Sequence, residues 1–199
     1  MLVSFEGLDG SGKSTQVELL RQQLAKAGRD VVATREPGGT ELGERLRELL
    51  LNGPEISPWA EAALFAAARA ELVERVIRPA LERGADVICD RYIDSSLAYQ
   101  GIARDLGLER VLELNLVAVG GLLPDRTFLL LVDLDRADRQ AGANPDRIER
   151  ESIDFRAAVD RAYRGLAGRF PDRIVTLDGA RPRAEIGRTS ARRLGVQGV

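Results

Sequence analysis

The segment of the chain best suited to chemistry lies close to its start. Residues 7–15 read Gly-Leu-Asp-Gly-Ser-Gly-Lys-Ser-Thr, with four residues between the first and last glycines and Lys-Ser directly after them. Such glycines let successive backbone N–H groups converge on phosphate oxygens. The Lys13 ammonium can then reach the outer phosphates, and the Ser14 hydroxyl can bind Mg²⁺. The spacing predicts a phosphate-binding loop made of Gly7, Leu8, Asp9, Gly10, Ser11, Gly12, Lys13, Ser14 and Thr15.

The rarity of lysine supports this interpretation. Of the 29 basic residues, only Lys13 and Lys26 are lysines. A compact ammonium on a flexible stem can fold over a glycine-lined loop, whereas a planar guanidinium cannot. Lys26 lies in the last turn of the helix expected after the loop, where we expect a solvated charge.

A second candidate element ends in the sequence Val87-Ile88-Cys89-Asp90. The carboxyl end of a parallel strand faces the same crevice as the loop, so Asp90 can hold Mg²⁺ through water. Arg91 follows directly and would add a cation to the acceptor side, although a surface ion pair is its plain alternative. Asp94–Gly101 is polar and suits a sugar and a base edge, or else a helix cap.

Further candidates lie between these two elements. Phe65 and Arg69 are four residues apart among alanines, which leaves room for a flat ligand beside the ring. Packing of Phe65 in the core, with Arg69 extending along it, is the equal alternative. Arg47 lies in the preceding helix and has a solvated position as its alternative.

The elements that must position these residues alternate between strand and helix. Apolar stretches predict five strands at Leu2–Glu6, Val31–Thr34, Asp86–Cys89, Thr127–Asp133 and Arg173–Leu177. Helical spacing predicts helices at Thr15–Ala27, Glu41–Leu51, Trp59–Arg83 and Leu108–Val119. This α/β order indicates a parallel sheet covered by helices on both faces, with right-handed crossovers. We expect one domain over residues 1–199, with an exposed flap at about 138–150 and a polar loop after the third strand.

Composition narrows the function. The net charge of −2 provides no global field for nucleic acid or a membrane surface. Histidine is absent and the single cysteine, Cys89, lies in an apolar strand, so histidine bases and cysteine-based zinc sites are excluded within one chain. No apolar run approaches the length of a membrane span, and a cytoplasmic protein is expected.

Taken together, these motifs resemble the bacterial thymidylate kinase family. The resemblance rests on Phe5–Thr15, on Arg-Glu-Pro-Gly-Gly-Thr at 35–40, on Phe65 with Arg69, and on Asp-Arg-Tyr followed by Ala-Tyr-Gln-Gly within 90–101. It runs from Leu2 to about Phe155. It implies a P-loop kinase fold with a mobile lid, ATP and Mg²⁺ as cofactors, and a homodimer. The implied reaction transfers the γ-phosphoryl group of ATP to dTMP.

The resemblance also implies roles for particular residues. Asp9 approaches the sugar 3′-hydroxyl and, with Ser14 and Asp90, is a candidate metal ligand. Phe65 stacks on thymine and Arg69 hydrogen-bonds its edge, while Arg47 and Arg91 hold the acceptor phosphate. Ser96 and Gln100 contact the base, and Tyr99 crowds the 2′ position. Lys13, Asp9, Arg91 and Arg147 are the candidate catalytic residues.

Members of this family keep a catalytic arginine either in the loop or in the flap. Gly10 occupies the loop position here, so the chain resembles the flap type. Asp146–Glu149 fits the flap pattern, although the stretch before it is shorter than usual. Arg136, Arg139 and Arg147 all remain candidates, and Arg147 is the best anchored.

Two other functions compete with this one. A GTPase-like switch usually reads guanine through Asn-Lys-x-Asp, but Lys13 follows Gly12 and Lys26 follows Ala25. A kinase of another nucleoside or nucleoside monophosphate is the alternative within enzymes. The apolar spacing of Leu108–Val119 could supply a dimer face or could be buried within one chain.

Overall fold

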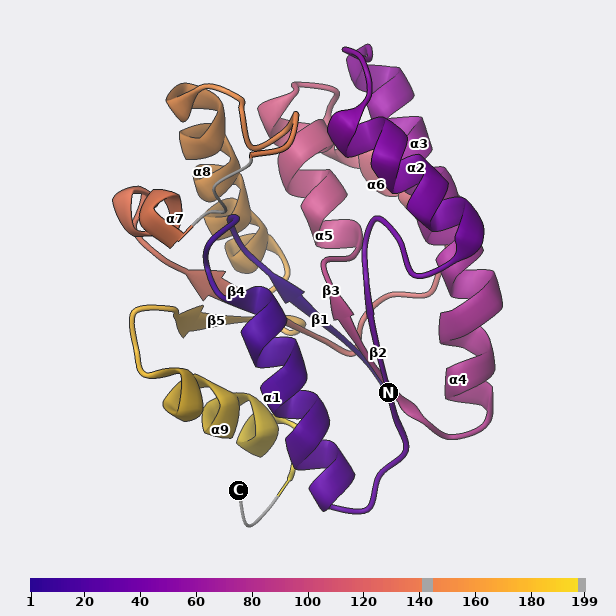
Figure 1. The fold of residues 1–199 in the computed structure, drawn as a ribbon, viewed down its shortest axis with the longest axis vertical. Coiled ribbons are helices and arrows are strands. Elements are labelled where there is room, and N and C mark those ends of the chain that lie inside the picture. The colour runs from indigo at the N-terminus through magenta and orange to yellow at the C-terminus, as the bar shows by residue number, and fades with distance from the viewer. Residues whose placement is uncertain (141–144, 197–199) are drawn as a thin grey trace.

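A five-stranded parallel sheet forms the centre of the computed structural model, which describes residues 1–140 and 145–196 (Figure 1). Its order is β2-β3-β1-β4-β5, with every neighbouring pair parallel. The strands are β1 Leu2–Glu6, β2 Val31–Arg35, β3 Asp86–Asp90, β4 Arg126–Leu131 and β5 Ile174–Asp178. All five predicted strands are confirmed, with ends shifted by at most two residues. The predicted parallel sheet is confirmed with them.

Helices cover the two faces of the sheet unequally. On one face, α1 (Lys13–Lys26) and α9 (Arg183–Arg193) lie side by side across the strands (Figure 1). Val3 and Phe5 point to this face, where they pack with Leu20 and Leu24 of α1. Because side chains alternate along a strand, Leu2 belongs to the core on the opposite face.

The opposite face carries the larger helical layer. It consists of α2 Glu41–Asn52, α3 Pro58–Leu72, η1 Val73–Ile77, α4 Arg78–Glu82, α5 Ile93–Ser96, η2 Leu97–Ala103, α6 Leu108–Ala118 and α8 Ile153–Arg169. The side chain of Thr40 caps α2 by accepting a hydrogen bond from the Gly43 N–H, and Ser152 caps α8 in the same way at Phe155. The capped ends lie at the carboxyl edge of the sheet, so this layer forms one wall of the site.

Two predictions about these helices need correction. The helix expected over Trp59–Arg83 is interrupted by η1, a π-helical turn at Val73–Ile77. The expected polar loop after β3 is helical, because α5 and the π-helical η2 follow Asp90 closely. Tyr99 and Gln100 are buried in η2 despite their polar groups, because the Tyr99 ring packs against Tyr163 of α8 and Gln100 donates to Glu61 of α3. Tertiary packing therefore overrides the composition of this run.

The predicted flap is only partly exposed. Helix α7 (Leu134–Gln140) includes its first residues, and residues 141–144 lie outside the described part of the chain. Beyond them, the backbone N–H of Arg147 donates to the Leu51 carbonyl at 2.8 Å, and Ile148 is 8% exposed. Arg147 and Ile148 thus pack against the helical layer, whereas Pro145 and Arg150 are exposed as expected for a flap.

Part of the candidate dimer face belongs to the core. Val111 and Val119 are buried within the chain, while Leu112 packs against the core from its rim. Val117, on the same helix, is 83% exposed.

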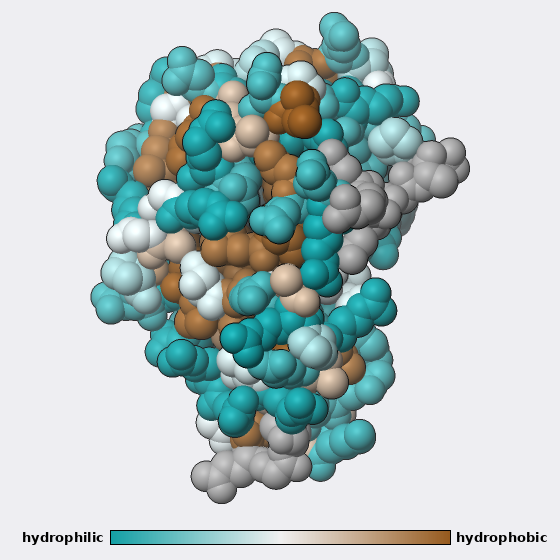
Figure 2. All heavy atoms as spheres, turned by 90° about the vertical axis from the view of Figure 1, so that its left-hand side faces the viewer, coloured by the Kyte–Doolittle hydropathy of each residue, from teal (hydrophilic) through white to brown (hydrophobic). Residues whose placement is uncertain are grey.

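The face at the side of α7 and α8 is largely hydrophilic, with hydrophobic atoms showing in recesses between polar ones (Figure 2). Among the described residues, no helix is both long and apolar enough to cross a membrane.

Candidate functional site

The predicted phosphate loop is a tight turn from β1 into α1. Gly7 has φ 137°, and a Cβ there would lie 2.6 Å from the Leu130 carbonyl oxygen, so no other residue fits against β4. Gly12 has φ 91° and is the N-cap of α1, whose first residue is Lys13. The free N–H groups and positive end of α1 therefore open onto the loop.

Lys13 lies folded back over this loop. Its Nζ donates to the carbonyls of Gly7 at 3.0 Å and Leu8 at 2.8 Å, and the residue is 6% exposed. Burial lowers the pKa of the Lys13 ammonium, and the neighbouring Arg91 cation acts in the same direction. A phosphate group in the loop would supply the negative charge that this ammonium needs.

Asp9 lies between two cations. Its carboxylate pairs with Arg91 at 2.5 Å and with Lys13 at 3.7 Å. Burial alone would raise the pKa of the Asp9 carboxyl, but the Arg91 and Lys13 charges outweigh it and hold that pKa well below its usual range. Asp9 is therefore an anion at neutral pH that can accept hydrogen bonds or bind a cation.

Ser14 and Asp90 meet where α1 begins and β3 ends. The Ser14 hydroxyl donates to the Asp90 carboxylate at 2.5 Å. The register explains this, because Asp90 pairs with Phe5 of β1 two residues before the loop. Two hard oxygen ligands held this close fit Mg²⁺, which binds carboxylate and hydroxyl oxygens and keeps several waters. No group of three or more acidic, cysteine or histidine side chains suited to a metal occurs in the described residues.

Arg91 projects into the cleft from the end of β3. Its guanidinium donates to Asp9, to the Ser95 hydroxyl at 3.1 Å and to the Tyr163 hydroxyl at 3.2 Å. It also lies over the Tyr99 ring, 5.4 Å from the ring centroid. The structure thus brings together three predicted residues, Asp9, Arg91 and Tyr99, at one point.

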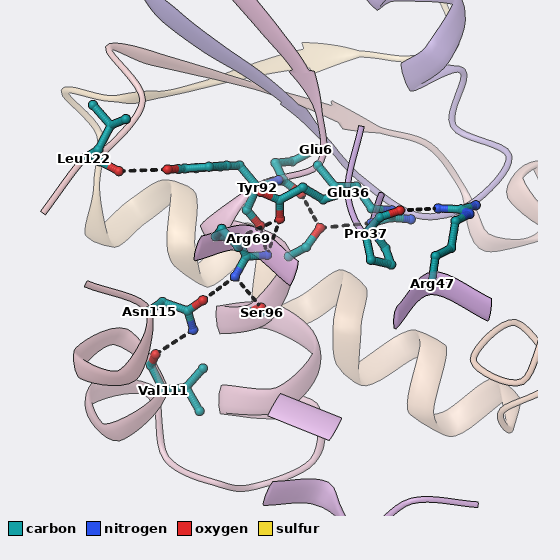
Figure 3. Close-up of polar contacts among 12 residues, drawn as sticks. Glu6, Glu36, Pro37, Arg47, Arg69, Tyr92, Ser96, Val111, Asn115 and Leu122 are labelled. Carbon is teal, nitrogen blue, oxygen red and sulfur yellow. Dashed lines mark hydrogen bonds and ion pairs between the residues drawn. The ribbon is translucent and has the colours of Figure 1, made fainter. Parts of the chain in front are cut away.

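Arg69 is held more tightly than the sequence suggests. It is 1% exposed and forms an ion pair with Glu36 at 2.6 Å (Figure 3). Its other donors reach the Ser96 hydroxyl at 3.0 Å, the Tyr92 carbonyl at 3.1 Å and the side-chain oxygen of Asn115. Burial would lower the pKa of the Arg69 guanidinium, but the Glu36 charge raises it. In this arrangement Arg69 does not line the pocket itself but holds Glu36 and Ser96, which do.

The flap candidate Arg147 lies against the helical layer. Its guanidinium donates to the Leu50 carbonyl at 2.9 Å and to the Glu61 carboxylate at 2.7 Å. Glu61 is buried and also accepts from Gln100 at 2.9 Å. Arg136 donates to the Ala180 carbonyl at 3.3 Å, whereas the side chain of Arg139 lies outside the described part of the structure.

One continuous cleft, with a volume of about 560 Å³, joins these groups. The predicted residues that line it are Asp9, Gly10, Gly12, Lys13, Ser14, Thr15, Arg47, Phe65, Asp90, Arg91, Ser96, Tyr99 and Gln100. Arg69 and Arg147 are not among its lining residues. Arg47 donates to the Pro37 carbonyl at 2.9 Å, which aims its guanidinium toward the loop of residues 35–40 (Figure 3).

Several residues that support the site were not predicted. Glu6 accepts hydrogen bonds at the end of β1, Tyr163 of α8 accepts from Arg91, and Glu36 and Asn115 hold Arg69. Glu6 did carry a signal, because an acidic residue ends a strand that is otherwise buried, as Asp90 does. Tyr163 and Asn115 gave none, since their partners lie far away in the chain.

The comparisons with known proteins agree with this geometry. A family model described as thymidylate kinase matches residues 5–189. A thymidylate kinase of Clavibacter michiganensis is 52% identical over 192 residues, covering 94% of this chain and 90% of that protein. The chain belongs to the thymidylate kinase family. Within it, a thymidylate kinase of Pelotomaculum thermopropionicum is 48% identical, covering 90% of this chain and 85% of that protein.

The fold of this family is shared as well. The crystal structure of thymidylate kinase from Ehrlichia chaffeensis matches with a TM-score of 0.81 and 32% identity. The match covers 98% of both chains. The resemblance inferred from the motifs is therefore confirmed for the family and the fold, and it extends beyond Phe155 to nearly the whole chain.

Proposed function

We propose that this chain transfers the γ-phosphoryl group of ATP to the 5′-phosphate of dTMP, giving dTDP and ADP. The observation that carries this conclusion is that one cleft is lined both by the phosphate loop and by Arg47, Phe65 and Arg91. The cations suit the acceptor phosphate, and the ring suits a flat base. Family membership supports the same reaction.

The chemistry needs positioning more than it needs a base. An oxygen of the dTMP phosphate attacks the γ-phosphorus, and the bond from that phosphorus to the bridging oxygen of ADP breaks. The attacking phosphate is already ionised near neutral pH, so the lack of histidine costs nothing. Lys13 and Arg91 neutralise the two anions as they approach, and this electrostatic placement accounts for most of the rate.

Magnesium belongs to the proposal through Ser14 and Asp90, whose oxygens already meet. When bound, the ion would neutralise charge on the ATP phosphates. Asp9 is the third candidate ligand, and its carboxylate is paired with Arg91. The activity of Asp90→Asn, measured as a function of Mg²⁺ concentration, should reach half of its maximum at a higher Mg²⁺ concentration than the activity of the original protein. Its Kd for dTMP should be unchanged.

Thymine recognition is proposed for Phe65, Ser96 and Gln100. Phe65 lines the cleft, and a ring stacked on a base contributes about 1–3 kcal/mol. Arg69 holds Ser96, and Glu61 holds Gln100, so both polar groups present fixed geometry to a base edge. Arg69 can reach the base itself only by giving up one of its present partners.

We propose that one of three arginines, Arg136, Arg139 or Arg147, is the catalytic arginine of the flap. Arg147 would have to leave the Glu61 carboxylate to reach a phosphate. Replacing each arginine by alanine and measuring kcat at saturating nucleotides separates them, since only the catalytic one should lower kcat by two or more orders of magnitude.

We further propose a cytoplasmic homodimer, because both substrates belong to the cytoplasmic nucleotide pool and Val117 of α6 is an apolar side chain that is 83% exposed. Light scattering after size exclusion gives the mass directly, and a monomer at micromolar concentration would oppose the dimer.

One experiment tests the proposed reaction as a whole. ADP release is measured with ATP and Mg²⁺ across a panel of nucleosides and nucleoside monophosphates. Activity with dTMP well above that with thymidine and with purine monophosphates is expected. A panel led by any nucleoside, or no diphosphate product from dTMP, would refute it.

A further inference from the structure

The backbone of Arg91 adopts a conformation that a side-chain-bearing residue rarely takes. Its φ is 70°, in the left-handed region, where a Cβ is crowded and the backbone of a residue other than glycine is strained. Two hydrogen bonds from the end of β1 hold it there. The Arg91 N–H donates to the Phe5 carbonyl at 2.9 Å, and the next N–H, of Tyr92, donates to the Glu6 carboxylate at 2.7 Å.

The Glu6 carboxylate also holds the Arg91 guanidinium, indirectly, through two hydroxyl groups. The hydroxyls of Ser95 and Tyr163 both accept from Nη1 of Arg91, at 3.1 and 3.2 Å. Both hydroxyls also lie within donating distance of Oε2 of Glu6, at 2.6 Å for Ser95 and 2.9 Å for Tyr163. A hydroxyl has one hydrogen, so giving it to Glu6 turns the oxygen lone pairs toward Arg91.

We propose that Glu6, Ser95 and Tyr163 are positioning residues that aim the Arg91 guanidinium at the acceptor phosphate. The carboxylate fixes the hydroxyls as acceptors, and the hydroxyls fix one edge of the guanidinium. The other nitrogen, Nη2, is held by Asp9 of the phosphate loop at 2.5 Å. This inference rests on the proposed function, which assigns the acceptor phosphate to Arg91.

Burial keeps the side chains of Glu6 and Tyr163 in fixed positions. Glu6 has no exposed surface and Tyr163 is 2% exposed, so neither side chain can turn toward solvent. The three residues come from different elements, β1, α5 and α8, and their polar groups hydrogen-bond to one another beside Arg91. A purely structural network would not need its two hydroxyls to converge on a group that lines the cleft.

A double-mutant cycle tests the inference. Tyr163→Phe removes one hydroxyl and keeps the buried ring. In the otherwise unchanged enzyme we expect it to lower kcat/KM for dTMP about tenfold, as for a lost hydrogen bond to a charged group, with KM for ATP unchanged. In an Arg91→Ala background the same change should lower kcat/KM by less than twofold, because its target is gone.

Two serine variants, one near Arg91 and one outside the cleft, control for a general loss of stability. Ser95→Ala removes a hydroxyl that touches Arg91. Ser190→Ala removes a buried hydroxyl of α9 that donates to the Ile186 carbonyl at 3.1 Å, outside the cleft. The first should lower kcat/KM for dTMP several-fold and the second should not, while melting temperatures show that both variants fold.

The outcomes separate this inference from the proposed function. If Arg91→Ala alone retains full kcat/KM for dTMP, the role proposed for Arg91 is wrong. If Arg91→Ala is severe but Tyr163→Phe costs the same factor in both backgrounds, the proposed function stands and the positioning role is overturned. Equal losses for Ser95→Ala and Ser190→Ala would overturn it as well.

Discussion

Arg173→Met should destabilise the protein far more than its place at the entry to β5 suggests. The Arg173 guanidinium donates to the two carboxylate oxygens of Asp94 at 2.5 and 2.7 Å, and to the Thr127 hydroxyl at 2.9 Å. The side chain of Asp94 is 1% exposed. Methionine keeps much of the apolar stem but leaves Asp94 as a buried charge with no cation beside it.

The magnitude follows from that burial. Removing one partner of a buried ion pair costs about 3–5 kcal/mol. For a chain of this length, 1 kcal/mol shifts the melting temperature by about 2–4 °C, so a fall on the order of 10 °C is expected. Urea unfolding followed by circular dichroism gives the change in the free energy of unfolding directly.

An exposed pair in the same chain supplies the control. Arg164 and Asp160 also pair within 2.8 Å, but the Arg164 side chain is 50% exposed. Such pairs contribute about 0–1 kcal/mol, so Arg164→Met should change little. Adding Asp94→Asn to Arg173→Met should restore part of the loss, because it removes the unpaired charge. Equal losses for the two arginine variants would show that the reasoning from burial is wrong.

Three further predictions concern the cleft. Lys13→Ala should lower kcat by a hundredfold or more while the Kd for dTMP, measured by calorimetry, stays within a few-fold, and a near-normal kcat would contradict its role. Phe65→Ala should raise KM for dTMP about tenfold without moving KM for ATP, whereas unchanged dTMP kinetics would exclude stacking. Burial, together with the Asp94 charge, raises the pKa of Glu6 to about 7, so this group stabilises the native state below pH 4.5 and loses that contribution as pH rises through 7. The free energy of unfolding of Glu6→Gln should therefore rise relative to the original protein between pH 4.5 and 7, by about 3 kcal/mol at most, and parallel curves would refute the shift.

The sequence predicts most of what the backbone does at this site. Asp90 ends β3, and Lys13 and Ser14 begin α1 directly after the loop that follows β1; parallel strands bring these ends to one edge. Local spacing is therefore enough to place them. The same holds for the five strands, whose apolar runs are short and bounded by turns.

What the sequence does not predict depends on distant partners. Arg69 could be read as a base contact or as a core residue, and its buried ion pair with Glu36 spans 33 positions. Its bond to Asn115 spans 46. The π-helical turn after Leu72 shifts the helix by part of a turn, so a single helical wheel over Trp59–Arg83 assigns wrong faces beyond it. Only the packed structure reveals these contacts.

The two lysines stand at opposite ends of one helix in contrasting surroundings. Lys13 begins α1 with its amine buried against the loop, whereas Lys26 ends the same helix exposed to solvent. A reagent that acylates amines thus meets a shielded target and an open one at the two ends of the 14-residue helix Lys13–Lys26. The ratio of the two adducts in a mass spectrum measures how well the loop shields Lys13, with Lys26 as an internal reference and no engineered label.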